Sequence, residues 1–196
     1  MDLRERVDGS REVLLGELNE FLGMPSISAR PDGNGEFRGC ARWVAEKLEE
    51  AGAEASIMET DGHPVVFSEI GEGPKTLLSY GHYDVQPPEP LDLWESDPFE
   101  PTVRDGGLYA RGVADDKADV LSRIQALRLY IEEHGSLPFK LKFLIEGEEE
   151  IGSPTLAPFV RANADLLSAD ACLWEGSMKD EAGRPMIFCE IGRAHV

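Results

Sequence analysis

The stretch DKADVLSRIQALRLYIEEHGSLPFKLKFLI, residues 116–145, joins a helix pattern to a strand pattern. From about residue 116 to residue 134, apolar residues recur three or four positions apart, as on one face of a helix: Val120, Ile124, Leu127 and Ile131. The apolar run at residues 140–145 then predicts a buried strand. A helix followed by a buried strand is typical of α/β domains, in which helices cover a sheet.

Two further helices are expected upstream, each with one apolar face to bury. The first covers residues 14–22 and is ended by Gly23 and Pro25. The second covers residues 37–48 and is ended by Gly52.

Strand-like runs complete the sheet on both sides of the opening stretch. They lie at residues 55–58, 65–70, 76–80 and 171–174. The turn-like Gly71-Glu72-Gly73-Pro74 predicts that the second and third of these runs form a hairpin. A short strand pair is expected around residues 104–107, and a helix over residues 155–167. We therefore predict an α/β domain with a mixed sheet flanked by helices, without a domain boundary inside the chain.

Composition and charge exclude several classes of protein. With 196 residues, of which 41% are hydrophobic, the chain can bury a substantial core. Its net charge of −19 repels nucleic acid phosphates and anionic membrane surfaces, so neither is expected as a partner. The sequence contains no stretch typical of a membrane span or a secretory signal, which predicts a cytoplasmic location. The cysteines Cys40, Cys172 and Cys189 have no paired spacing, which argues against a disulfide framework or a thiolate zinc site.

Polar clusters stand where strands end and loops begin. They contain His82 with Asp84, Asp115 with Asp116, the run at residues 148–150, and Glu175. In open α/β sheets, ligands bind in the crevice beyond the carboxyl ends of the strands, so these clusters can meet in space.

Each cluster also has a purely structural interpretation. His82 and Asp84 are compatible with a metal ligand and the carboxylate that orients it, but equally with a loop histidine and a turn aspartate. Asp115 and Asp116 precede a helix, where an acid caps the first turn and suits the helix dipole. The run at residues 148–150 is compatible with a solvated loop, although three adjacent carboxylates repel one another unless cations or protons offset them.

Two long stretches carry a resemblance to a known family. They are LLSYGHYDVQPPEPLDLWESDPFEPTVRDGGLYARGVADDKADV at residues 77–120 and LIEGEEEIGSP at residues 144–154. Both closely resemble the two-metal peptidase family of carnosinase, cytosolic non-specific dipeptidase, carboxypeptidase G, aminoacylase and succinyl-diaminopimelate desuccinylase. The resemblance extends over nearly the whole chain, and the motifs follow one another in the same order as in the family. It implies a zinc-peptidase-like catalytic domain and hydrolysis of a peptide or amide bond near a free carboxylate.

The resemblance also implies roles for individual residues. His82 binds one of two divalent metal ions, Asp84 orients His82, and Asp115 bridges both ions. Glu175 is a further acidic ligand of the ion bound by His82, and the peptide bond between Asp115 and Asp116 is cis. Zinc is the expected metal, while manganese or cobalt suits the same nitrogen and oxygen ligands.

Within the glutamate run, the assignment depends on alignment at Gly152-Ser153. That alignment makes Glu149 the general base, acting on a water between the two metals, and Glu150 a ligand of the second metal. A shift by one residue gives these roles to Glu148 and Glu149. The chain has Ala118 after Lys117 where the family usually has glycine, which predicts an adjustment at the helix start and no loss of chemistry.

A family site needs a second histidine ligand, and none of His63, His134 and His195 fits that role. Residues 191–196 read like a translated sequencing adapter, so we hypothesise a non-native tail there and assign residues 1–190 to the N-terminal part of the catalytic domain. On this interpretation the chain is an incomplete, inactive fragment of a protein that forms a homodimer through a lid domain.

The predicted activity of the full protein is metal-dependent cleavage of a dipeptide or an N-acyl amino acid. An alternative is a non-catalytic acidic module that binds metal or a partner on the same scaffold. A magnesium phosphohydrolase is a third choice, disfavoured because residues 71–75 do not form a phosphate-binding loop.

Overall fold

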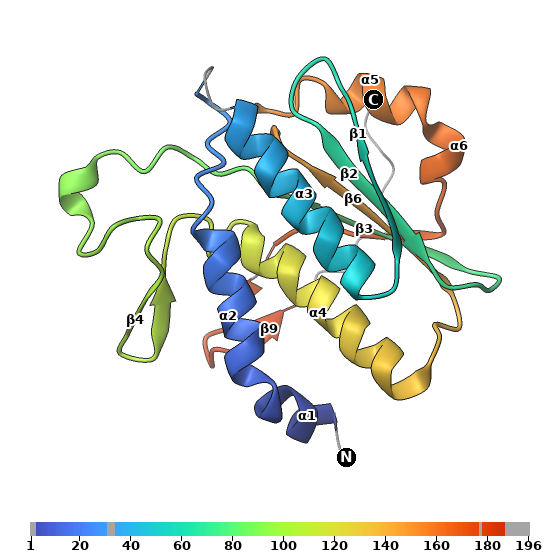
Figure 1. Cartoon of the computed structure of the whole chain (residues 1–196), viewed down its shortest axis with the longest axis horizontal. Helices are drawn as coiled ribbons and strands as arrows, with labels where there is room; N and C mark the ends of the chain where they lie inside the picture. Colours follow the sequence, from blue (N-terminus) through green and yellow to red (C-terminus); the bar gives the residue numbers. More distant parts are fainter. Residues whose placement is uncertain (1–2, 31–33, 177, 187–196) are drawn as a thin grey trace.

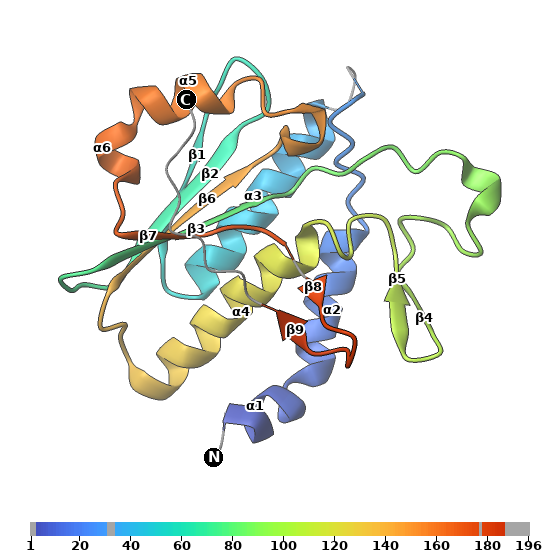
Figure 2. The ribbon, with the colours of Figure 1, turned by 180° about the vertical axis from the view of Figure 1, so that it is seen from behind.

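The structure is a computed structural model that describes residues 3–30, 34–176 and 178–186. Helices α3 (Asn34–Glu50) and α4 (Lys117–His134) cover one face of a central sheet, and α2 (Arg11–Leu22) packs against α4 (Figure 1). Helices α5 (Leu156–Ala162) and α6 (Ala164–Leu167) lie against the opposite face, as Figure 2 shows from behind. A short helix, α1 (Leu3–Gly9), precedes α2. Two 3-10 turns lie within loops, η1 (Leu91–Leu93) and η2 (Glu149–Ile151).

The central sheet is mixed. Its strands follow the order β1 (Glu54–Met58), β2 (Val65–Ile70), β6 (Lys140–Glu146), β3 (Thr76–His82) and β7 (Ala171–Leu173). β3 runs parallel to β6 and β7, whereas β2 is antiparallel to β1 and β6. Two smaller ribbons pair β4 (Thr102–Arg104) with β5 (Gly107–Tyr109), and β8 (Met178–Lys179) with β9 (Pro185–Met186). The predicted mixed sheet flanked by helices is confirmed.

Alternating side chains of the central strands build two cores. Val66, Phe143 and Ile145 pack with α3 and α4 in the larger cluster. Their neighbours Val65, Phe67 and Leu144 pack with Phe159 and Leu167 of α5 and α6 in the smaller one. Successive residues of a strand point to opposite faces, so strands covered on both sides are apolar throughout.

The predicted hairpin between residues 65–70 and 76–80 is wrong. β6 lies between β2 and β3, and the hairpin of this region is β1 with β2. Gly71, with a φ of 81°, packs so closely on the carbonyl of Phe139 that a side chain there would clash with it. The turn therefore passes around the start of β6. The apolar strand takes the central place because both of its faces are then buried.

The helix predicted over residues 155–167 is interrupted. Asn163, with φ −117° and ψ 25°, separates α5 from α6. Both its main-chain N–H and its side-chain amide donate to the carbonyl of Phe159, at 3.0 and 2.9 Å. Local side-chain hydrogen bonding of this kind competes with helix continuation.

The other predicted helices and strands are present, with ends shifted by a few residues. Within the described residues, none of the helices combines the length and apolarity needed to cross a membrane. Cys40 is buried, Cys172 is exposed and both are free thiols, while Cys189 lies outside the described residues.

Candidate metal centre

The carboxyl ends of β3 and β6 meet the start of α4. His82 and Glu146, the last residues of the two strands, are paired in register. The main-chain N–H of His82 donates to Asp116 Oδ2 at 3.1 Å, and the Asp115–Asp116 peptide bond is cis, as the family resemblance implied. Asp116 occupies the N-cap position of α4, but its side chain makes no capping hydrogen bond. Asp116, which was expected to cap the helix, therefore links the start of α4 to the end of β3 instead.

Asp84 holds the imidazole of His82 from behind. His82 Nδ1 lies 3.2 Å from Asp84 Oδ1 and 3.1 Å from the Asp84 carbonyl, and both side chains are fully buried. Since both neighbours are acceptors, Nδ1 carries a proton and Nε2 is presented to the other side. The same carboxylate accepts the main-chain N–H groups of Glu149 and Glu150, at 3.2 and 3.1 Å. One buried aspartate therefore fixes both the imidazole and the glutamate loop.

Three carboxylates from separate segments surround Nε2 of His82. The nearest oxygens lie 2.9 Å away on Asp115, 3.3 Å away on Glu175 and 3.9 Å away on Glu149. Their side chains are 70%, 20% and 33% exposed, so the cluster is open on the side of Asp115. Glu175 Oε2 is buried without a hydrogen-bond partner. A buried carboxylate oxygen of this kind is costly unless a cation satisfies it.

The pKa values of the cluster reflect this demand for positive charge. Burial lowers the pKa of His82, but the hydrogen bond and charge of Asp84, with the charges of Asp116 and Glu175, raise it to about 10. Burial raises the pKa of Asp116 to about 7 and that of Glu175 to about 7. Protons thus occupy the cluster where a cation would otherwise balance the acids.

The residues present fit a divalent ion. One ligand atom each from His82, Asp116 and Glu175 lie within 4.8 Å of one another. From the sequence, Asp116 was expected to be a helix cap and part of a cis peptide bond, so its place in this group was missed. The available signal was its position beside Asp115, but sequence spacing does not reveal which of two adjacent acids turns inward. Imidazole nitrogen and carboxylate oxygen are ligands that zinc and manganese accept.

The three adjacent glutamates have different surroundings. Glu148 is buried and accepts a hydrogen bond from the hydroxyl of Thr155. Glu149 extends toward Nε2 of His82, and the carboxylate of Glu150 accepts the side-chain amide of Gln86 at 2.9 Å. Burial raises the pKa of Glu150, and the charges of Asp115 and His82 also act on it. Glu150 therefore lies near the cluster, whereas Glu148 pairs with Thr155.

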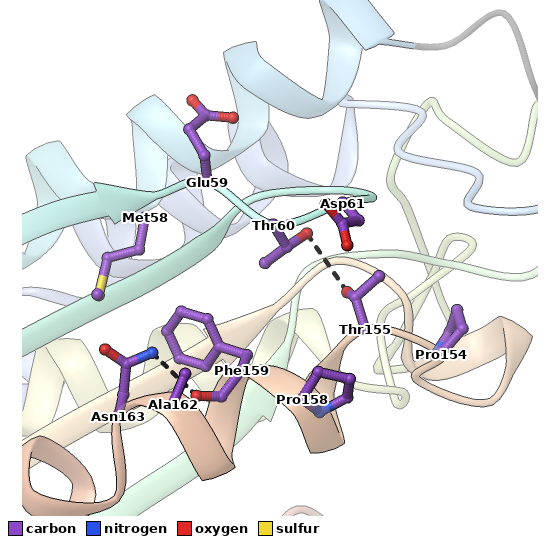
Figure 3. Close-up of a pocket in the computed structure, with 10 residues that line it drawn as sticks. All are labelled: Met58, Glu59, Thr60, Asp61, Pro154, Thr155, Pro158, Phe159, Ala162 and Asn163. Atoms are coloured by element: carbon purple, nitrogen blue, oxygen red, sulfur yellow. Dashed lines mark hydrogen bonds between the residues drawn. The ribbon is translucent and has the colours of Figure 1, made fainter.

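Glu148 instead supports the wall of a separate cavity of about 640 Å³. Figure 3 shows this cavity between the β1–β2 loop and α5, with Thr60 and Thr155 joined across it by a 3.3 Å hydrogen bond. None of the residues that surround Nε2 of His82 lines it.

The other histidines of the described residues stand apart from the cluster. His63 stacks on Phe37 with ring centroids 3.6 Å apart, and His134 ends α4 against Tyr130 at 4.3 Å. His195 and the proposed tail at residues 191–196 lie outside the described residues.

Residues 78–188 match the model of Peptidase family M20/M25/M40. The matched range contains His82 and the glutamate run at residues 148–150. The chain belongs to this family. It is 36% identical over 166 residues to a cysteinylglycine-S-conjugate dipeptidase of Corynebacterium striatum, a match that covers 82% of the chain and 36% of the relative.

Solved structures support M20/M25/M40 membership at the level of the fold. The M20 family metallo-carboxypeptidase Sso-CP2 of Sulfolobus solfataricus superimposes with a TM-score of 0.81 at 40% identity, covering 87% of this chain and 39% of that one. Human carnosine dipeptidase 1 superimposes with a TM-score of 0.82 at 30% identity, covering 88% and 40%. The chain thus spans about two fifths of the length of these relatives, and the predicted family and fold are confirmed.

Proposed function

We propose that this chain supplies the metal-binding edge of a hydrolase that cleaves the peptide or amide bond of dipeptides or N-acyl amino acids. The observation that carries the proposal is the arrangement around His82. Its Nδ1 is fixed by a buried aspartate, and its Nε2 is ringed by carboxylates, one of which has an unsatisfied buried oxygen. The relatives named dipeptidase and carboxypeptidase support the reaction class.

His82 and Glu175 would hold one ion, and Asp115 would bridge it to a second ion held by Glu150. Asp116, which lies with His82 and Glu175, would either bind the first ion or support Asp115 from the buried side. Asp84 keeps one proton of His82 on Nδ1, so that Nε2 would offer its lone pair to an ion that displaces the other ring proton. A divalent ion bound here would polarise the scissile carbonyl and lower the pKa of water.

Glu149 is suited to the role of general base. Its main chain is anchored on Asp84, and its carboxylate lies at the edge of the cluster, one third exposed, within 3.9 Å of His82 Nε2. A carboxylate so placed takes a proton from water and returns it to the leaving amine. The surroundings of Glu148, which faces Thr155, support this register of the glutamate run.

Metal analysis joined to a dipeptide assay tests the proposal. The 196-residue chain is titrated with Zn²⁺ and Mn²⁺, and the product of the whole open reading frame that contains it is assayed on dipeptides and N-acyl amino acids. We expect bound metal in both and hydrolysis in the latter. Metal without hydrolysis favours a non-catalytic acidic module, and absence of metal binding excludes the proposed centre.

Zinc as the native metal is part of this proposal, since nitrogen and carboxylate ligands suit it. A cytoplasmic location and a homodimer formed through a lid domain are also proposed. Both rest on the sequence and its family resemblance.

A further inference from the structure

The position of Glu175 is not explained by the sheet that precedes it. The parallel ladder between β3 and β7 runs from Leu77 opposite Ala171 to Ser79 opposite Leu173, and stops there. Glu175 lies two residues further on, beyond the last pair of the ladder. Its Oε2 is buried without a hydrogen-bond partner and lies 3.3 Å from His82 Nε2, so apart from this ion pair its place beside His82 depends on how its main chain is held.

Beyond the last pair of the ladder, Arg123 of α4 links the two strands through its side chain. Its Nη1 donates to the carbonyl of Tyr80 at 2.7 Å, and its Nη2 donates to the carbonyl of Trp174 at 2.8 Å. These carbonyls belong to the next residue after each member of the last pair. The planar fork of a guanidinium can join two acceptors at fixed separation, which a lysine ammonium does less well.

A second contact holds the same segment from the opposite face of the sheet. The rings of Tyr80 and Trp174 stack with centroids 3.9 Å apart and planes inclined by 18°. Tyr80 belongs to the core on the side of α5 and α6, and its hydroxyl donates to Glu146 at 2.6 Å. The residue before Glu175 is thus clamped between the aromatic stack and Arg123.

We propose that Arg123 is a positioning residue that acts through Glu175: it holds the Trp174 carbonyl on β3 so that the next carboxylate reaches the ion bound by His82. The inference rests on the metal centre proposed above. Arg123 itself contacts no metal ligand atom in this role. Instead, it holds the main chain of Trp174 and thereby positions the side chain of Glu175.

Charge alone predicts the opposite effect, which makes the inference testable. Arg123 lies 3.7 Å from Asp119, and its charge is among the influences that oppose the burial-driven rise in the pKa of Asp116. A positive charge near the cluster repels a divalent ion. Its removal should therefore tighten metal binding if electrostatics dominates and weaken it if positioning dominates.

The experiment compares Zn²⁺ affinity in the 196-residue chain and its variants. For Arg123→Met we expect affinity to fall by about 10–100-fold, the usual effect of losing a residue that orients a ligand. Arg123→Lys keeps the charge but loses the planar fork. Its Zn²⁺ affinity is expected to lie between those of the parent chain and Arg123→Met. Arg128→Met is the matched control, since Arg128 lies on the same helix, is 18% exposed against 16% for Arg123, and contacts Glu17 instead. It should leave Zn²⁺ affinity unchanged.

A double-mutant cycle shows whether Arg123 acts through Glu175. In a Glu175→Gln background, Arg123→Met should have little further effect on Zn²⁺ affinity, because residues that act as a unit are not additive. Full additivity of the two losses, or equal or tighter Zn²⁺ binding by Arg123→Met, would overturn the inference.

Hydrogen exchange of the metal-free chains separates this inference from the metal centre itself. Amides of residues 173–176 should exchange faster in Arg123→Met than in the parent chain and in Arg128→Met. Unchanged exchange would refute the clamp whatever the metal result. Faster exchange in a chain that binds no Zn²⁺ would leave the clamp in place and overturn both the metal centre and the proposed role of Arg123 in it.

Discussion

The main-chain N–H of His82 donates to the side chain of Asp116 at 3.1 Å, joining the end of β3 to the start of α4. A residue that sequence rules identify as a helix cap therefore uses its carboxylate to hold the strand end. With Asp84 on the other side of the imidazole, His82 is fixed through its main chain and its ring. His82 is thus anchored at the end of a strand, and rigid elements are where precise side-chain geometry is best maintained.

Replacement of Asp84 by asparagine tests the support of the imidazole. The variant keeps the size of a fully buried side chain but removes the charge that holds Nδ1–H and the two main-chain N–H groups of the glutamate loop. We expect Zn²⁺ affinity to fall by about 10–100-fold. The exposed Asp92→Asn is the control, and an Asp84→Asn chain with parental affinity would refute this role.

The base assignment predicts different results for adjacent glutamates. In the product of the whole reading frame, Glu149→Gln should retain metal and lose turnover by about 10²–10⁴-fold, the usual contribution of a general base. Glu148→Gln should retain most of its activity, because Glu148 faces Thr155 and not His82. Reversed results, measured as kcat on a dipeptide with metal content in parallel, would assign the base to Glu148.

The ion pair between α2 and α4 predicts a pH-dependent stability. Burial by itself raises the pKa of Glu17, but hydrogen bonds from Arg128 and Gln125 and the charge of Arg128 bring it below its usual value. A lowered carboxyl pKa stabilises the fold above the unfolded pKa, about 4.3, and this contribution is lost as pH falls through the folded pKa. Glu17→Gln should therefore cost about 1 kcal/mol at pH 7 and less near pH 3. Denaturant unfolding at both pH values measures this, with the exposed Glu12→Gln as control.

Replacement of Lys117, the residue after Asp116, is expected to lower the unfolding free energy. Its buried Nζ donates to the carbonyls of Phe21 and Met24, at 2.9 and 2.5 Å, and lies 4.9 Å from the centre of the Phe21 ring. Lys117→Met leaves both carbonyls without this donor, so we expect a loss of about 2–4 kcal/mol in unfolding free energy. Lys75→Met, which replaces a side chain that is 74% exposed, should cost less than half as much. Equal losses would contradict a special role for the buried ammonium.

Several features were predictable because their signals are local. The stripe of α4 repeats every three or four residues, and three of its members, Val120, Ile124 and Leu127, are buried. The clusters that carry His82, Asp115 and Glu175 could be expected to meet because they follow strand ends of one α/β sheet. The cis peptide bond at Asp115–Asp116 came from the family resemblance, and the structure confirms it.

Residue type and short-range spacing were enough to predict most helices and strands and the segments that carry the acids. The packing of distant segments was needed to establish that β6 separates β2 from β3, that Asp116 turns inward, and that Glu148 turns toward Thr155. Strand order follows from which run can be buried on both faces, and the direction of adjacent carboxylates follows from the partners that distant segments bring to them. Those partners are set by the packing of the whole domain.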